Sequence, residues 1–203
     1  MKYLCQFLCF AIPSAIIFLC FSSYRKKALA AMKLRSSKLR EVFLLIFVML
    51  ISGIIALKIW PVYYKSPESG DIKLLLDRPS WDAQFHYIPF SMLIDYYKCC
   101  TEYGSSDLIS IMINIGGNFI AFIPVGRLAD LLFRDFTWKQ TVITGFALSL
   151  FTETAQYFIM RNTSIDDILL NTVGTICGHL LFLLLRHLSP ALTKKFQCNS
   201  IKY

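Results

Sequence analysis

The sequence predicts an all-α fold, a polytopic integral-membrane helical bundle with about five transmembrane helices. Hydrophobic residues make up 56% of the 203 residues and charged residues only 17%, whereas a soluble domain carries about a quarter of charged residues. The apolar residues come in blocks of about 20, the length that crosses a bilayer as a helix. Lysine and arginine lie at the ends of these blocks, which indicates membrane topology and not a nucleic-acid groove. We therefore expect membrane lipids, and no nucleic acid, among the partners.

The first predicted span covers residues 3–23. Lys2 ahead of an apolar core is also typical of a signal peptide, but no small-x-small cleavage site directly follows the block, so we expect this span to be retained. Residues 25–41 hold seven Lys/Arg and one acidic residue, Glu41. The positive-inside rule places this segment in the cytoplasm.

The other four predicted spans are separated by one long and two short polar segments. Residues 61–107 are rich in acidic residues, which suits the outer side, and residues 86–97 within them form an apolar segment too short to span. We expect that segment to be interfacial or re-entrant. The four spans are 42–60, 108–128, 140–158 and 168–185.

The lysine and arginine distribution sets the predicted orientation. With the N-terminus outside and the C-terminus inside, cytoplasmic segments hold 14 of the 21 Lys/Arg, as the positive-inside rule requires. The chain then divides into three parts. They are an N-terminal transmembrane helix with its basic cytoplasmic loop (1–41), a membrane domain (42–187) and a basic cytoplasmic tail (188–203).

The seven cysteines show neither a CxxC motif nor a metal-ligand spacing, so we predict no metal site and no cofactor. Four of them lie in apolar spans, where a thiol usually behaves as a small hydrophobic group. Cys99 and Cys100 are adjacent in the segment expected outside. They can pair with each other only under strain, or with another chain, and their role stays open.

Polar residues share one face in each of the last three predicted spans. In the fourth and fifth spans they follow the spacing of a single helical face, and in the third they recur every four residues. Counted from the outer ends of their helices, Asn114, Asn118, Glu153 and Asn171 reach a common level in the outer leaflet. The three sets are Ser149, Thr152, Glu153 and Gln156; Asp167, Asn171, Gly174 and Gly178; and Asn114, Asn118 and Phe122.

Small residues on the same spans are expected to let the helices approach closely. Gly116 and Gly117 provide this on the third span, and Gly174 and Gly178 on the fifth. His179 lies deeper, in the inner half of the membrane, and we expect it to be a satisfied core group.

An ionisable glutamate inside an apolar run needs a partner, and it marks a functional site by default. Glu153 is such a residue, and Arg161 and Asp166 lie in the short link that follows its helix. Arginine is a rigid bidentate donor, so Arg161 would hold an anionic group, while the amides would orient the ligand or only join helices. The expected ligand-binding residues are Asn114, Asn118, Glu153, Gln156, Arg161, Asp166, Asp167 and Asn171.

In these elements the sequence resembles the VanZ-like family of small bacterial membrane proteins, over about residues 40–187. The resemblance implies a multi-pass protein of the bacterial plasma membrane with a role in the cell envelope. It also implies an association with low-level resistance to the glycopeptide teicoplanin, which is a phenotype and not a mechanism. The matching elements, in order, are Ile88-Pro89-Phe90, Asn114-x3-Asn118-x3-Phe122-x-Pro124-x-Gly126, Glu153-x2-Gln156, and Arg161 leading to Asp166-Asp167-x3-Asn171-x2-Gly174.

Three functions fit these observations. The first is binding of an amphiphilic or lipid-linked ligand, such as a lipoglycopeptide or a cell-wall lipid, in an outer-leaflet polar pocket. The second is an intramembrane hydrolase or transferase acting on a lipid head group, with Glu153, Asp166 and Asp167 as candidate acids or bases. In that hypothesis the three carboxylates could also hold a divalent cation. The chain carries no HExxH or GxSxG motif, so the question of enzymatic activity stays open. The third is a small transporter or assembly subunit. The ligand and the oligomeric state stay open.

Overall fold

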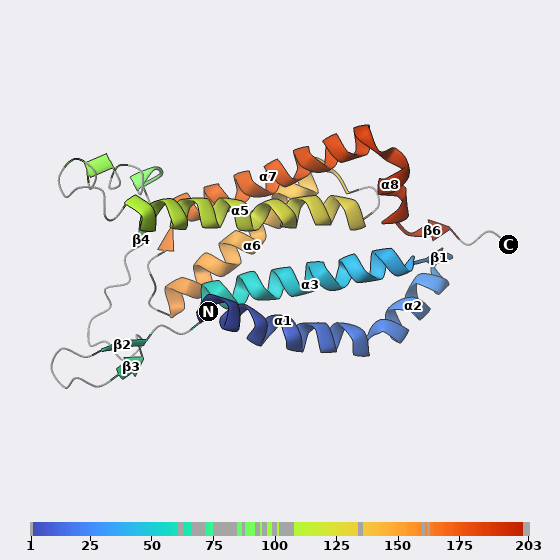
Figure 1. Ribbon diagram of the computed structural model, residues 1–203, viewed down its shortest axis with the longest axis horizontal. Coiled ribbons are helices and arrows are strands. Elements are labelled where there is room, and N and C mark those ends of the chain that lie inside the picture. Colours follow the sequence, from blue (N-terminus) through green and yellow to red (C-terminus); the bar gives the residue numbers. More distant parts are fainter. Residues whose placement is uncertain are drawn as a thin grey trace.

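The computed structural model confirms the all-α bundle (Figure 1). It describes residues 2–60, 63–65, 72–74, 85–86, 88–91, 94, 97–98, 101, 108–133, 136–159, 161 and 163–200. Side chains are described for 3–60, for the given residues of 88–101, and for those of 115–198. The side chain of Asn114 and both Cys99 and Cys100 therefore lie outside the described residues.

The N-terminal part of the chain forms a helical hairpin. Helix α1 (Lys2–Cys20) continues into α2 (Ser22–Ala31), and α3 (Lys38–Ile59) returns beside α1 (Figure 1). Much of the basic segment 25–41, expected as a loop, is thus helical, because alanine, lysine and arginine are strong helix formers. The side chain of Ser37 caps α3 by accepting a hydrogen bond from the Arg40 amide.

The C-terminal part forms a three-helix unit of α5 (Leu108–Leu132), α6 (Trp138–Phe158) and α7 (Ile165–Leu188), followed by the short α8 (Pro190–Lys195). Thr137 and Gln140 form a capping box that starts α6. The side chain of Ser164 accepts from the Asp166 amide and starts α7.

Of three short strand pairs, two join segments that are far apart in the sequence. The parallel pair of β4 (Phe85–His86) and β5 (Thr163–Ser164) has the most bearing on function, because it brings the segment before Phe90 to the link between α6 and α7. The two antiparallel pairs are β1 (Leu34–Arg35) with β6 (Asn199–Ser200), and β2 (Tyr63–Lys65) with β3 (Ile72–Leu74).

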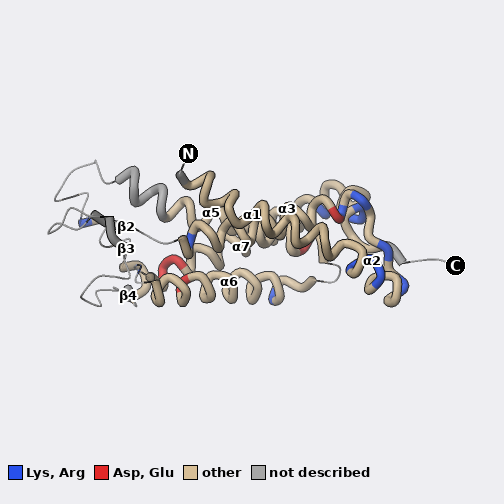
Figure 2. Tube along the Cα trace, turned by 90° about the horizontal axis from the view of Figure 1, so that it is seen from below, with Lys and Arg blue, Asp and Glu red and all other residues tan. Residues whose placement is uncertain are grey.

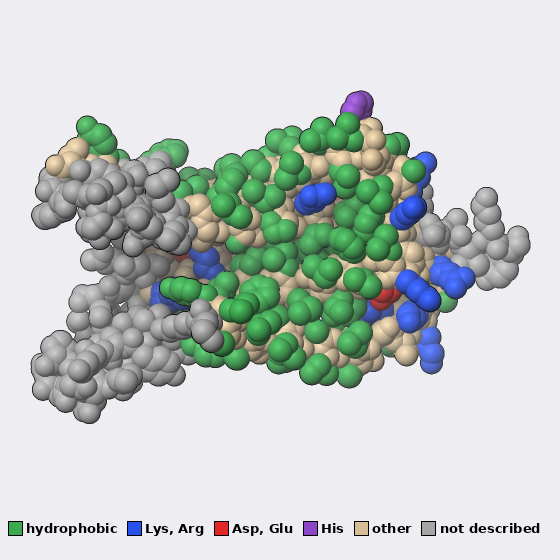
Figure 3. Space-filling view, in the orientation of Figure 1, with side chains coloured by type: hydrophobic (Ala, Val, Ile, Leu, Met, Phe, Trp, Pro, Cys, Tyr) green, Lys and Arg blue, Asp and Glu red, His purple; other side chains and the backbone are tan. Residues whose placement is uncertain are grey.

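Within the described residues, four helical segments are long and apolar enough to cross a membrane. The predicted span 140–158 forms α6, which is long enough but does not reach the hydropathy of the other four because its buried face is polar. Hydrophobic side chains cover the middle of the molecule's visible face, as expected of a surface in contact with lipid (Figure 3). The four segments are Tyr3–Cys20, Lys38–Ile59, Ile115–Leu132 and Ile165–Leu188.

The closest helix contact is between α5 and α7, and three glycines make it possible. A Cβ atom on Gly126 would overlap the backbone of Thr175, and one on Gly178 would overlap the carbonyl of Ile123. Gly174 likewise lies against the backbone of α5. The expectation for α7 is therefore confirmed, but the expectation for α5 is wrong. At Gly116 and Gly117 no atom of the described residues lies within 4 Å of such a Cβ, because the helices cross nearer to Gly126.

Helices α6 and α7 run antiparallel and meet through polar or small residues spaced four apart on each helix. Asn171 Nδ2 donates to Ser149 Oγ at 2.8 Å, and one turn further along, the Thr175 side chain lies against Gly145. The stripes predicted on both helices are buried, as expected: Ser149, Thr152, Glu153 and Gln156 on α6, and Asp167, Asn171, Gly174 and Gly178 on α7.

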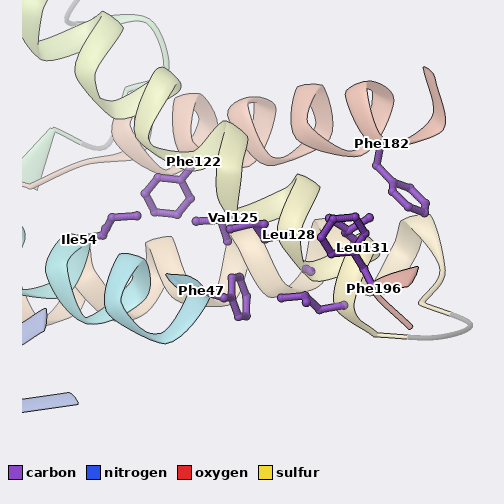
Figure 4. Close-up of a cluster of buried hydrophobic side chains, with 10 residues drawn as sticks. Phe47, Ile54, Phe122, Val125, Leu128, Leu131, Phe182 and Phe196 are labelled. Atoms are coloured by element: carbon purple, nitrogen blue, oxygen red, sulfur yellow. The ribbon is translucent and has the colours of Figure 1, made fainter. Parts of the chain in front are cut away.

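The apolar core lies between the hairpin and the three-helix unit (Figure 4). Phe47 and Ile54 of α3 face Phe122 and Val125 of α5 there, and Phe122 and Val125 have no exposed surface. This core fixes the position of α3 against α5, and therefore also where the last turn of α3 meets α6 and α7.

Candidate functional site

A lysine–carboxylate cluster joins α3 to α6 and α7 at one end of the bundle. The Lys58 ammonium lies 3.2 Å from Glu153 Oε1 and 3.4 Å from Asp167 Oδ2. The side chains of Glu153 and Lys58 are 3% and 14% exposed, respectively. A buried carboxylate pair needs such a counter-charge, because an unpaired charge in an apolar interior is very costly.

Neutral donors hold each carboxylate independently of Lys58. Asn118 Nδ2 of α5 donates to Asp167 Oδ1 at 2.6 Å, and the Ser164 amide donates to Glu153 Oε2 at 3.3 Å. The amide of Gln156, turned so that its nitrogen faces Glu153, donates to Oε1 at 2.9 Å and to Oε2 at 3.2 Å. Four helices therefore contribute to one polar cluster.

The helix ends favour these charges. Lys58 lies in the last turn of α3, where the helix dipole is negative, and Asp166 and Asp167 lie in the first turn of α7, where it is positive. Figure 2 shows acidic and basic residues side by side at this end, near β4, and most other lysines and arginines at the opposite end, around α2.

Arg161 binds the end of α3 and not the carboxylates. Its Nη1 donates to the carbonyl of Lys58 at 2.7 Å and to that of Leu57 at 3.4 Å. The Leu57 carbonyl cannot receive the usual helical hydrogen bond from residue 61, because Pro61 has no N–H. Burial lowers the pKa of the Arg161 guanidinium and the charge of Glu153 opposes that shift, so the group stays protonated.

Asp166 lies at the rim of the cluster, next to the segment that β4 brings in. The Phe90 amide donates to Asp166 Oδ1 at 2.5 Å. Phe90 has a φ of 65°, and its side chain is 60% exposed. Ile88 and, at the end of α6, Phe158 are also exposed. A polar cluster thus lies beside exposed apolar side chains.

Asn171 lies one turn along α7 from Asp167 and extends the polar region inward. It is fully buried, and its Oδ1 has no hydrogen-bond partner within the described residues. Its amide nitrogen is used by Ser149. Within the described part of the chain, this oxygen is therefore a buried acceptor without a donor, one helical turn from Asp167.

A second polar cluster lies near the opposite end of the three-helix unit. Asp130, 2% exposed, accepts a hydrogen bond from Thr141 Oγ1 at 2.5 Å and lies 2.8 Å from His179 Nδ1. His179 is thus satisfied, as expected. Each of the three residues comes from a different helix, so the cluster joins α5, α6 and α7 to one another.

Sequence reasoning found most of the first cluster but missed Lys58. The structure brings together Asn118, Glu153, Gln156 and Asp167, places Asp166 at the rim, and places Arg161 and Asn171 beside it. Lys58 is near the end of a predicted span, where lysines usually extend to the interface, so its local pattern does not mark it as part of a site. A charge count was the available signal, because three predicted site carboxylates had only Arg161 as a partner.

The described residues contain no group of three or more metal-ligating side chains. The contacts that the structure shows in the cluster are ion pairs and hydrogen bonds. A model of the VanZ/LLP1 family matches residues 7–186. The chain belongs to the VanZ/LLP1 family.

The match covers nearly the whole chain and confirms the resemblance seen in the motifs. It begins within α1, and so includes the N-terminal hairpin, which the motif resemblance did not cover. Neither the curated proteins nor the solved structures contain a match. With its apolar helices, this VanZ/LLP1 chain is a membrane protein.

Proposed function

We propose that this VanZ/LLP1 protein binds an amphiphilic or lipid-linked molecule of the bacterial cell envelope, with its head group in the lysine–carboxylate cluster. The observation that carries the proposal is the ion-paired cluster of Lys58, Glu153 and Asp167 within a bundle of apolar helices. Ionisable groups in such bundles mark ligand or ion sites by default.

The surroundings of the cluster suit an amphiphile. The exposed apolar side chain of Phe90 belongs to a residue whose amide donates to Asp166 at the rim of the cluster, so an acyl chain could lie against it while the head group enters the cluster. The topology expected from the lysine and arginine distribution would place the cluster on the outer side of the plasma membrane. A ligand there would be a cell-wall lipid or a lipoglycopeptide.

Hydrogen bonding at Glu153 favours binding over acid–base catalysis. One oxygen faces Lys58 and the other accepts from the Ser164 amide. A general acid or base has to exchange a proton with its substrate, whereas both oxygens of Glu153 already have hydrogen-bond partners within the protein. The enzyme and transporter hypotheses involve the same residues, but each requires these residues to do more than hold a ligand.

The test is binding to the purified full-length protein. We expect lipid or lipoglycopeptide to raise its melting temperature, and Glu153→Gln to abolish that rise. Glu41→Gln is the matched control, because Glu41 is paired with Arg25 at 2.7 Å at the opposite end of the bundle. If no amphiphile binds, or if Glu153→Gln binds as the wild type does, the proposal is wrong.

The same variants serve in cells to test a contribution to glycopeptide resistance. We expect a deletion strain to become more sensitive to teicoplanin-type drugs, with rescue by the wild type and by Glu41→Gln at matched membrane levels, and none by Glu153→Gln. If deletion leaves drug sensitivity unchanged, the protein does not contribute to resistance, and ligand binding is then judged from the purified protein alone.

A further inference from the structure

The Lys58 ammonium occupies a position that a ligand's ammonium group could take. It lies between Glu153 and Asp167 at 3.2 and 3.4 Å, whereas charge-assisted N–H···O bonds are typically about 2.7–2.9 Å. Lysine is a compact point charge on a flexible stem, and Lys58 lies in the last turn of its helix. It can therefore leave the carboxylates and extend its ammonium toward water.

The two carboxylates stay oriented without Lys58. Asn118 fixes Asp167 from α5, and the Ser164 amide fixes Glu153. These donors are neutral. Within the described residues, Lys58 is the one cation within salt-bridge distance of the two carboxylates. A pair of carboxylates that keeps its orientation without Lys58 can therefore accept another ammonium in its place.

Two further groups indicate what else the head group contains. The Oδ1 atom of Asn171, on the same face of α7 as Asp167, is buried without a hydrogen-bond partner within the described residues and can accept an N–H. Arg161 uses only Nη1 in its hydrogen bonds within those residues. Its other N–H groups can hold an anionic group beside the ammonium.

We propose that Glu153 and Asp167 bind the primary ammonium of a zwitterionic head group, in exchange for Lys58, with the anionic part of the same head group held by Arg161. This inference rests on the proposed function and names its substrate class, an amphiphile with an ammonium and a phosphate. The exchange replaces one positive charge by another, so the net charge of the cluster does not change.

The experiment compares lipids with identical chains and different head groups. We expect phosphoethanolamine lipid to raise the melting temperature of the purified full-length protein. Phosphocholine lipid should have little effect, because its quaternary ammonium has no N–H to donate, and phosphoglycerol lipid should have little effect, because it has no cation. Soluble phosphoethanolamine without chains is added separately: a shift of similar size would assign the affinity to the head group alone and overturn the amphiphile as substrate class.

Lys58→Met tests the exchange itself. Because the variant removes the internal competitor, we expect half-saturation at a lower phosphoethanolamine-lipid concentration than in the wild type. Lys139→Met, an exposed lysine on α6, is the control and should leave the response unchanged. Should Lys58→Met not fold, the head-group comparison in the wild type and the loss of response in Asp167→Asn decide the matter.

Besides an equal response to soluble phosphoethanolamine, three results would overturn this inference. They are equal responses to phosphoethanolamine and phosphocholine lipids, a weaker response in Lys58→Met, and an unchanged response in Asp167→Asn. If another amphiphile binds in a Glu153-dependent way without preferring an ammonium, the proposed function stands and the head-group assignment fails. If no amphiphile binds, both fail.

Discussion

At the scale of single residues, Lys58 has the largest effect on how the site is built. It comes from α3, while its partners Glu153 and Asp167 come from α6 and α7. Removing one partner of a buried ion pair leaves the other charge uncompensated, which costs more than the pair contributes. Replacing Lys58 should therefore be more severe than replacing Glu153, because it leaves two carboxylates without a cation.

We expect Lys58→Met to lower the free energy of unfolding by about 3 kcal/mol and Glu153→Gln by about 2 kcal/mol, because the Gln side chain keeps part of the hydrogen bonding. In the double variant the loss should be smaller than the sum, by about 1–3 kcal/mol. SDS-induced unfolding of the four proteins in one detergent measures this. Strictly additive losses would show that the two side chains do not interact.

At the scale of helices, the contact between α5 and α7 determines whether Asn118 can reach Asp167. That hydrogen bond is 2.6 Å long, and the helices carrying it touch backbone to backbone at Gly126, Gly174 and Gly178. Any side chain at these glycines has to push the two helices apart, because the atoms it meets belong to the backbone. The packing contact and the polar site are therefore coupled through the same pair of helices.

We expect Gly178→Ala to lower the stability by about 1–3 kcal/mol through overpacking and to weaken ligand binding. Gly117→Ala is the control within the same pair of helices, because its Cβ would meet no atom within 4 Å. There the higher helix propensity of alanine should leave stability equal or raise it by about 0.5–1 kcal/mol. Melting temperatures measured side by side would contradict this if the two variants behaved alike.

At the scale of the whole molecule, polar contacts attach the N-terminal hairpin to the three-helix unit near both ends of α3. At one end Arg161 donates to the last carbonyls of α3, beside the Lys58 cluster. At the other, Arg40 Nε donates to the Leu132 carbonyl at 3.2 Å, and Ser37 Oγ donates to the Lys195 carbonyl at 2.9 Å. The apolar core lies between these attachments.

We expect Arg161→Gln to loosen the last turn of α3, because the Leu57 carbonyl then has no donor in place of the missing N–H of Pro61. The loss should be about 1 kcal/mol. Hydrogen–deuterium exchange of peptides covering 50–60 should become faster, with no change in peptides covering the start of α3. If Arg161→Gln leaves the exchange of the 50–60 peptides as it is in the wild type, Arg161 does not stabilise that helix end.

Much of this arrangement could be predicted from local patterns. Helical spacing predicted the buried faces of α6 and α7, because on each helix the polar and small residues around Glu153 or Asp167 recur every three to four positions. Lys58 could not be found in this way. Its partners are 95 and 109 residues away, and a terminal lysine in a span has the same local pattern whether it is paired or solvated.

The part of Gly126 in the helix contact and the β4–β5 pair escaped prediction for a related reason. Which glycine of α5 meets α7 depends on where the two helices cross, and the adjacent Gly116 and Gly117 are a more conspicuous pair than the single Gly126. The pairing of Phe85–His86 with Thr163–Ser164 depends on two segments that approach only in the folded chain.

The ion pair between Lys58 and its two carboxylates also has a consequence for biosynthesis. Chains fold from the N-terminus during synthesis, so α3 enters the membrane before α6 and α7 have been made. Until they arrive, Lys58 has to extend its ammonium to the interface. Because its partners lie on the last two long helices, charge neutralisation within the membrane comes late in assembly, and a nascent chain that ends before Glu153 carries an unmatched cation.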